Sequence, residues 1–234
     1  SPVHGKQMIA GKALGAIVMS IAALFGASPA TADTPEVSAG ELRVIEGFES
    51  QFVPARDIYV WLPDGYSELK EYAVLYMQDG QMLFDASTTH NGQEWGVDEV
   101  ASKLMAEAKV RDFIVVGIPN AELERGNEYL PQKPFEMLTT EERGSFIAAA
   151  MDGKREMDSE VRSDRYLRFL VEELKPYVDS HYPVLTDSGN TFVMGSSMGG
   201  LISIYALARY PGTFGGAGCL STHWPGLAPY QGNP

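Results

Sequence analysis

Short apolar runs alternate with longer amphipathic stretches along this chain. The apolar runs are rich in β-branched and aromatic residues, which favour β-strands. Two of them, Glu71–Met77 and Asp112–Ile118, are almost continuously apolar, as is typical of strands that are covered on both faces of a parallel sheet. The pattern predicts strands at residues 41–48, 56–62, 71–77, 112–118, 192–194 and 215–221.

Apolar residues recur at helical spacing between these runs. Residues 95–108 and 158–180 each have an apolar stripe with polar residues between its members, and weaker patterns predict helices at 139–151 and 201–208. Strands that alternate with helices predict an α/β fold, with a mostly parallel central sheet and helices on both faces. In such a sheet the functional site lies beyond the carboxyl ends of the strands.

Several loops should therefore meet at that edge. Residues 78–81, the insertion 119–157, Ser197 and the loop that holds His223 each follow a predicted strand. A long insertion after a core strand often forms one wall of a site.

The segment Gly195-Ser196-Ser197-Met198-Gly199 joins a predicted strand to a predicted helix. Strand, G-x-S-x-G and helix together are typical of a nucleophile elbow, in which the serine has a strained backbone conformation. Gly195 and Gly199 lack the Cβ atoms that would clash in so sharp a turn. An ordinary loop of glycine and serine is the alternative. We interpret Ser197 as a nucleophile at a helix N-terminus, where free N–H groups favour negative charge.

Residues 1–32 have the organisation of a secretory signal peptide. Lys6 and Lys12 precede an apolar run at 13–25, and Ala30-Thr31-Ala32 provides a cleavage site. The run is short for a membrane span, although an uncleaved anchor is the alternative. We therefore predict a secreted or periplasmic protein, free of the membrane after cleavage, whose residues 33–234 form one α/β domain.

Charge and composition narrow the possible partners. The 234 residues carry a formal net charge of -13, which argues against nucleic acid and anionic membranes as partners. Cys219 is the single cysteine, so an intramolecular disulfide is impossible, and its apolar surroundings predict a buried side chain. No close cluster of His, Asp and Glu suggests a metal. We expect neither metal nor cofactor, and the sequence leaves the oligomeric state open.

A set of short segments occurs in one order along the chain: Trp61–Pro63, Val74–Asp85, Trp95–Asp98, Gly117–Asn120 with Arg125 and Tyr129, Glu172–Tyr177 and Gly195–Gly200. Together they resemble the putative-esterase family, which includes esterase D, enterochelin esterases, feruloyl esterase domains and mycolyltransferases. The resemblance covers roughly residues 55–224, which makes it far more specific than any one motif.

The resemblance implies an α/β-hydrolase fold and hydrolysis of a small-molecule or sugar ester through an acyl-enzyme. It implies Ser197 as the nucleophile, with the backbone N–H groups of Gln81 and Met198 as donors to the oxyanion. Asp79 and Gly80 would lie against the substrate in the same loop as Gln81. An acyltransferase of the same family is the nearest alternative activity.

The sequence departs from the family's pattern after the elbow. No Asp or Glu follows Ser197, and His223 is the only later histidine, too early for the family's catalytic histidine. We therefore expect a chain that is incomplete at its C-terminus, lacks its last strands and helices, and is itself inactive. A triad acid and histidine would then come from sequence beyond Pro234. A non-catalytic binding protein on a hydrolase scaffold is the alternative.

The remaining candidates have structural and functional interpretations. His223 either lines the substrate pocket together with Trp224, or is a structural histidine, or is a substitute base, in that order of preference. We interpret His90 and His181 as surface or capping residues. Arg125 is either a partner in a loop salt bridge, which we favour, or a contact for a substrate carbonyl or carboxylate.

Overall fold

The computed structural model of the protein describes residues 34–152 and 160–224, and the backbone alone at 149–152. The predicted signal peptide at residues 1–32 lies outside the described residues, so export stays a prediction.

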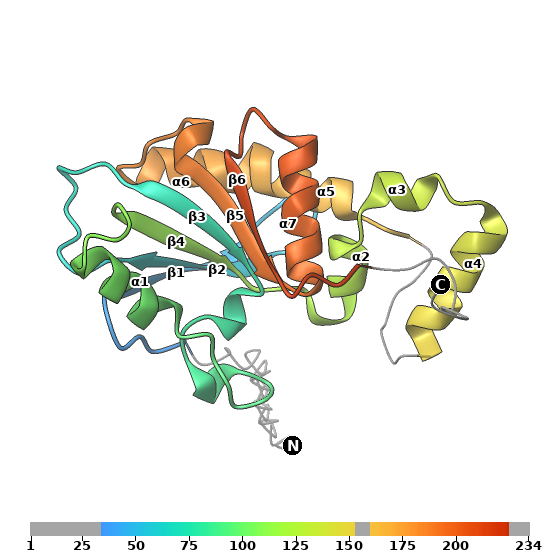
Figure 1. The fold of residues 1–234 in the computed structure, drawn as a ribbon, viewed down its shortest axis with the longest axis horizontal. Helices are drawn as coiled ribbons and strands as arrows, with labels where there is room; N and C mark the ends of the chain where they lie inside the picture. Colours follow the sequence, from blue (N-terminus) through green and yellow to red (C-terminus); the bar gives the residue numbers. More distant parts are fainter. Residues whose placement is uncertain (1–33, 153–159, 225–234) are drawn as a thin grey trace, which may run out of the picture. The chain divides into compact units, whose positions relative to one another are not determined.

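The described strands form one mixed sheet (Figure 1). The strands are β1 (Glu41–Phe48), β2 (Arg56–Leu62), β3 (Ala73–Gln78), β4 (Phe113–Ile118), β5 (Thr191–Ser196) and β6 (Gly216–Leu220). Their order across the sheet is β1-β2-β4-β3-β5-β6. The β4, β3, β5 and β6 strands run parallel, whereas β1 pairs antiparallel with β2, and β2 with β4. All six predicted strands are confirmed, and so is the mostly parallel sheet.

Helices fill the connections from β3 to β4, from β4 to β5 and from β5 to β6. They are α1 (Val97–Ala106), α2 (Arg125–Tyr129), α3 (Gln132–Glu136), α4 (Thr140–Asp152), α5 (Ser163–Arg168), α6 (Lys175–His181) and α7 (Met198–Arg209). A π-helical stretch, Phe169–Leu174, joins α5 to α6. The insertion after β4 thus contains two helices, α2 and α3, that the sequence pattern did not predict. Each has five residues, which is too short for apolar periodicity to register.

The long helix predicted at 158–180 is divided and starts later, at Ser163. Pro176 lies in the first turn of α6. Proline has no N–H group, and in a regular α-helix its ring would clash with the carbonyl of Glu172, four residues earlier. The wider turns just before Pro176 accommodate this defect within one continuous helical segment.

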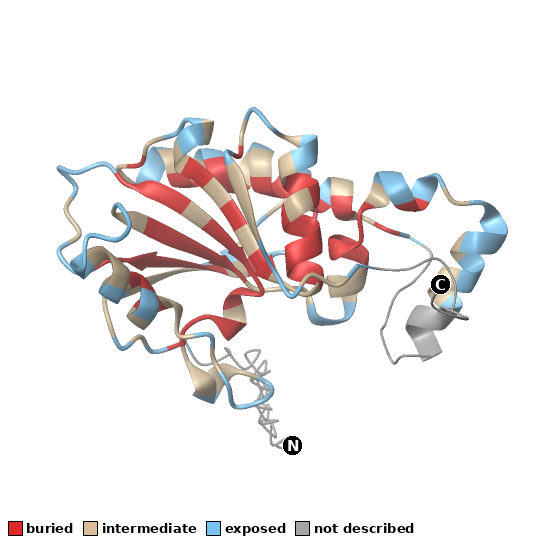
Figure 2. Ribbon diagram, viewed as in Figure 1, coloured by how far each residue is buried: buried red, intermediate tan, exposed pale blue. Residues whose placement is uncertain are grey.

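Alternate residues of the central strands enter two hydrophobic cores on opposite faces of the sheet. On β2, Ile58 and Val60 belong to the larger core, whereas Tyr59 and Trp61 belong to the smaller one. Helices α5, α6 and α7 cover the larger core, and α1 covers the smaller one (Figure 1). Buried residues concentrate on the central strands and on α7 (Figure 2). Helices on both faces are therefore confirmed.

Cys219 is exposed, which corrects the expectation of a buried side chain. It lies on β6, which pairs only with β5 among the described strands. An apolar run at the rim of a sheet looks like a buried strand in sequence, although one of its sides has no neighbouring strand to cover it.

Across residues 34–152 and 160–224, no helix combines the length and the apolar character that crossing a membrane requires.

Candidate active site

The carboxyl ends of the parallel strands lie at one edge of the sheet. Gln78, at the end of β3, is in register with Ile118 at the end of β4. Ser196, at the end of β5, is in register with Leu220 at the end of β6. The loops that follow these four strands therefore meet at this edge, as the sequence predicted.

Ser197 occupies the turn between β5 and α7. Its backbone has φ 57° and ψ −119°, a conformation that residues with a Cβ rarely adopt. Its N–H donates to the Leu220 carbonyl at 2.9 Å, and its own carbonyl accepts from the N–H groups of Leu201 at 3.2 Å and His223 at 3.1 Å. These contacts hold the strained turn, which has the conformation expected of a nucleophile elbow.

Glycines make the elbow possible. A Cβ on Gly195 would lie 2.4 Å from the carbonyl carbon of Gly199, and a Cβ on Gly200 would lie 2.8 Å from Thr222 Oγ1. A Cβ on Gly199 would lie 3.0 Å from Asp79 Oδ2. The last contact brings the first turn of α7 against the loop that follows β3.

The β3 strand ends in a left-handed residue. Asp79 has φ 56° and ψ 48°, and a 3₁₀ turn, η1 (Gly80–Met82), follows it. The first hydrogen bond of this turn runs from Met82 N–H to the Asp79 carbonyl at 2.8 Å. The N–H groups of Gly80 and Gln81 precede that bond and so take no part in it. A Cβ on Gly80 would lie 2.6 Å from the Ile118 nitrogen, so the close approach of β4 requires glycine here.

The Asp79 carboxylate is the centre of a polar network. Arg125 donates to it from Nε to Oδ1 at 2.6 Å and from NH2 to Oδ2 at 2.8 Å. Asn120 Nδ2 donates to Oδ1 at 2.7 Å. The Asp79 side chain is 5% exposed. The salt bridge predicted for Arg125 is therefore present, and the prediction that Asp79 binds substrate stays a prediction.

Further hydrogen bonds hold the neighbouring residues of this loop. Asn120 N–H donates to Gln81 Oε1 at 3.1 Å, and Asp79 N–H donates to the Tyr129 hydroxyl at 3.3 Å. At the last residue of β3, Gln78 Oε1 accepts from the Tyr166 hydroxyl. Gln78, Asp79 and Gln81 thus each have a hydrogen bond with the insertion or with α5, and a side chain takes part in each of these bonds.

A second ion pair anchors α2 to the sheet. Arg56 on β2 donates to Glu128 on α2 from NH2 to Oε1 at 2.6 Å and from NH1 to Oε2 at 2.9 Å. Both side chains are buried, and the Arg56 guanidinium also lies over the rings of Tyr166 and Phe169. The α2 helix therefore connects β2 to the loop after β3.

Both arginines remain charged in these surroundings. Burial lowers the pKa of Arg125, but its hydrogen bonds and attraction to Asp79 outweigh burial and raise the pKa overall. Burial also lowers the pKa of Arg56, and its hydrogen bonds and attraction to Glu128 raise that pKa overall. Burial raises the pKa of the Tyr129 hydroxyl well above its ordinary value. The network thus contains two arginine cations, each paired with its own carboxylate, and the neutral hydroxyl of Tyr129.

The loop after β6 returns to the elbow. His223 is half-buried and contacts the Ser197 carbonyl through its backbone N–H. Trp224 is 67% exposed. The predicted contacts of His223 and Trp224 with substrate, and the roles of Gln81 and Met198 as oxyanion donors, stay predictions.

The other described histidines lie on the surface, as expected. His90 is exposed. His181 is also exposed, with its ring stacked on Tyr177 at a centroid distance of 3.9 Å and its Nδ1 2.8 Å from the Tyr177 carbonyl. Within the described ranges, no three His, Cys, Asp or Glu residues form a group that could hold a metal ion.

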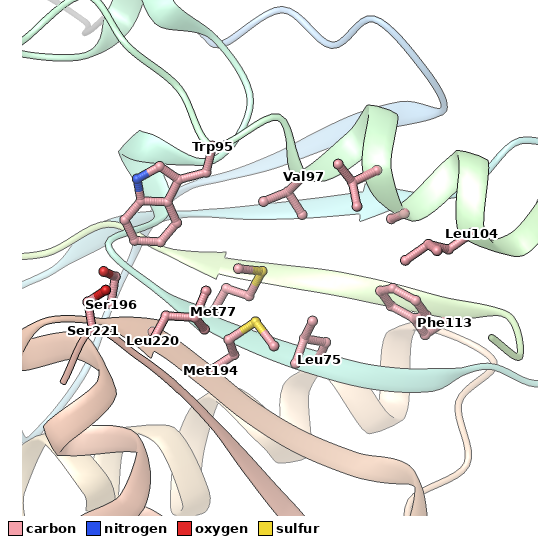
Figure 3. Close-up of a pocket in the computed structure, with 13 residues that line it drawn as sticks. Leu75, Met77, Trp95, Val97, Leu104, Phe113, Met194, Ser196, Leu220 and Ser221 are labelled. Carbon is pink, nitrogen blue, oxygen red and sulfur yellow. The ribbon is translucent and has the colours of Figure 1, made fainter. Parts of the chain in front are cut away.

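An apolar groove of about 360 Å³ lies between α1 and the sheet (Figure 3). Leu75, Met77, Phe113 and Met194 line its sheet side and Leu104 its α1 side. Trp95 lies opposite Ser196 and Ser221 at the end of the groove nearest the elbow (Figure 3). The groove offers apolar surface beside the candidate nucleophile.

Sequence reasoning did not assign roles to Asn120, Glu128 or Tyr129. Asn120 carried a usable signal, because a polar residue directly after a buried strand belongs to the functional edge. Glu128 carried none, since its partner Arg56 lies 72 positions away.

Known proteins resemble this chain in sequence. A profile of the family described as "Putative esterase" matches residues 54–231. The uncharacterized protein YjcH of Bacillus subtilis (strain 168) is 25% identical over 169 residues, which are 72% of this chain and 56% of the relative. The chain spans just over half the length of the curated relatives it matches.

Solved structures also share the fold. A ferulic acid esterase from the anaerobic fungus Anaeromyces mucronatus has a TM-score of 0.55 and 23% identity, over 87% of this chain and 67% of that one. The enterobactin esterase of Shigella flexneri has a TM-score of 0.51 and 18% identity, over 84% of this chain and 40% of that one. At these identities the likeness shows the fold alone, which is α/β-hydrolase-like.

Proposed function

Because the chain belongs to the family described as "Putative esterase", we propose that it hydrolyses a carboxylic ester through an acyl-enzyme on Ser197. One observation carries the proposal, namely the strained backbone of Ser197 at the start of α7. Strain of this kind costs roughly 1–3 kcal/mol, and a plain loop of glycine and serine would not need it.

The chemistry follows from the arrangement at the sheet edge. Ser197 Oγ attacks the ester carbonyl carbon and loses its proton to a base, and the carbonyl oxygen becomes negatively charged. The N–H of Met198, in the first turn of α7, and the N–H of Gln81, in η1, are the proposed donors to that oxygen. The intermediate then collapses to the acyl-enzyme, and the base gives its proton to the departing alcohol. Water attacks the acyl-enzyme with its proton taken up by the same base, which returns it to Ser197 Oγ as the acid leaves.

The base that takes the proton of Ser197 has two candidate sources. His223 is the only histidine that follows Ser197 in this sequence, and its backbone already contacts the elbow. The expectation that the base and its orienting acid come from sequence beyond Pro234 stays a prediction. The substrate is proposed to be a small-molecule or sugar ester. Two structural relatives are described as esterases of ferulic acid and of enterobactin.

The proposal predicts that Ser197→Ala abolishes ester hydrolysis. The assay uses p-nitrophenyl acetate and the natural gene product, including any residues that follow Pro234. Ser180→Ala is the control, because Ser180 is an exposed serine on α6 and lies outside the elbow and the groove. We expect a loss of at least about 1,000-fold in kcat for Ser197→Ala, since catalysis by the activated nucleophile disappears, and a change below about threefold for Ser180→Ala.

Labelling with a fluorophosphonate provides an independent readout, because it requires an activated serine. Labelling of the wild type and of Ser180→Ala, but not of Ser197→Ala, supports the proposal. Equal hydrolysis by the wild type and Ser197→Ala contradicts it. A wild type that neither hydrolyses esters nor takes the label also contradicts it and favours a binding protein. Capture of the acyl group by an added alcohol in preference to water favours an acyltransferase.

A further inference from the structure

The loop after β3, which presents the proposed donor Gln81, begins with a residue in an unfavourable backbone conformation. Asp79 separates β3 from Gln81 and has φ 56°, in the left-handed region that residues with a Cβ seldom occupy. The direction of the Gln81 N–H depends on this turn, because Asp79 sets the course of the chain into η1. Aspartate enters this region more readily than most residues with a Cβ, and contacts that fix its side chain stabilise the conformation further.

Those contacts use both carboxylate oxygens. Arg125 engages Oδ1 and Oδ2 in a bidentate pair at 2.6 Å and 2.8 Å, and Asn120 adds a bond to Oδ1 at 2.7 Å. Paired hydrogen bonds of this kind restrict direction as well as distance. Since the side chain is 5% exposed, the carboxylate is committed to the protein's own donors.

Asp79 also lies against the helix turn that carries the other proposed donor. Its Oδ2 is 3.0 Å from the position that a Cβ on Gly199 would take. Gly199 directly follows Met198 in the first turn of α7. The Asp79 side chain thus lies between the two backbone segments that present Gln81 and Met198.

The arginine itself has a fixed position. Its guanidinium lies over the Tyr129 ring at 5.0 Å, and Tyr129 accepts the Asp79 N–H. Glu128, next to Tyr129, is bound bidentately by Arg56 on β2. The short helix α2 is therefore a support that runs from β2 to Asp79.

We propose that Asp79 and Arg125 are positioning residues for the oxyanion donors: the ion pair holds Asp79 in its left-handed conformation and thereby aims the Gln81 N–H. This inference rests on the proposed function. It assigns Asp79 to support of the loop in place of substrate binding. Arg125 acts through Asp79 and contacts no reacting atom.

The test measures kcat and KM of purified variants, so that a loss of turnover is distinguished from a loss of substrate binding. Arg125→Gln removes the charge and the paired geometry, whereas Arg125→Lys keeps the charge without the fork. Arg168→Gln is the control, because Arg168 forms an exposed pair with Glu172 and has no contact with the loop after β3 among its described interactions. The substrate is the neutral p-nitrophenyl acetate, and thermal unfolding of every variant is measured alongside.

We expect Arg125→Gln to lower kcat by about 10- to 100-fold, less than the loss from deleting an oxyanion donor outright, with KM within about twofold. The kcat of Arg125→Lys should lie between those of Arg125→Gln and the wild type. Asp79→Asn should resemble Arg125→Gln, and the double variant should be no worse than either, because both break one pair. If Arg125→Gln fails to fold, Arg125→Lys and Asp79→Asn provide the same comparison.

Other outcomes overturn the inference in distinguishable ways. Hydrolysis that depends on Ser197, with kcat unchanged in Arg125→Gln and Asp79→Asn, overturns the positioning role alone. A rise in KM confined to esters with a carboxylate, with kcat intact, also overturns it and makes Arg125 a substrate contact. Equal hydrolysis by the wild type and Ser197→Ala overturns this inference together with the proposed function.

Discussion

At the scale of single residues, backbone conformation and missing Cβ atoms define the candidate site. Ser197 and Asp79 both have positive φ without being glycine, and each begins a segment that presents a proposed oxyanion donor. Gly195 and Gly80 lie where another backbone segment approaches within 3 Å of a would-be Cβ. The two glycines are required by space, whereas Ser197 and Asp79 keep their side chains in spite of an unfavourable backbone angle.

The elbow glycine provides a prediction at this scale. Gly195→Ala places a methyl group 2.4 Å from the backbone of Gly199, and backbone cannot move aside without opening the turn. We expect a loss of about 2–3 kcal/mol or more in the free energy of unfolding, measured by urea denaturation. Gly212→Ala is the control, because nothing lies within 4 Å of its would-be Cβ. The loss of unfolding free energy in Gly212→Ala should stay within about 0.5 kcal/mol. Equal urea midpoints for the two variants would contradict the close approach of Gly199 to Gly195.

At the scale of elements, the sequence pattern succeeded where periodicity was long or apolar runs were continuous. The strands that became β1 and β2 have the predicted bounds, and α7 extends the predicted helix at both ends. The pattern missed α2, which joins the site to the sheet. A five-residue helix forms because Arg125, Glu128 and Tyr129 find distant partners, and its own five residues contain no repeating signal.

The anchoring of α2 provides a prediction at this scale. Arg56→Met leaves the Glu128 carboxylate buried without its cation, which should cost about 3–5 kcal/mol of unfolding free energy. The double variant Arg56→Met/Glu128→Leu removes both charges and should recover most of that loss. Urea denaturation of the wild type, both single variants and the double variant measures the coupling. A double variant as unstable as the sum of its single variants would show that the pair is not coupled.

At the scale of the whole described domain, the two faces of the sheet are packed unequally. The larger core beneath α5, α6 and α7 contains most of the fully buried side chains. The smaller core beneath α1 borders the apolar groove, where Leu104 and Met194 are only half-buried. Stability should therefore depend mainly on the larger core.

A matched pair of substitutions tests this asymmetry. Leu170→Ala opens a cavity in the larger core, where the side chain has no exposure, and should cost about 2–5 kcal/mol. Leu104→Ala removes the same atoms from the wall of the groove and should cost less than about 1.5 kcal/mol, because part of this surface is already in water. Both are measured by chemical denaturation of the natural gene product, including any residues that follow Pro234. Equal losses would mean that the groove is closed in solution.

The sequence by itself determined the succession of the six strands and of the longer helices along the chain, the mostly parallel α/β class and the elbow around Ser197. Each of these depends on residues close together in the chain, where apolar spacing and small residues report local conformation directly. The tertiary structure alone decided that Asp79 is bound by Arg125, that the His223 backbone contacts Ser197 and that Cys219 is exposed. A sequence pattern reports that a side chain has an apolar or polar neighbourhood. Which distant residue supplies that neighbourhood depends on how the strands are ordered and in what register they pair.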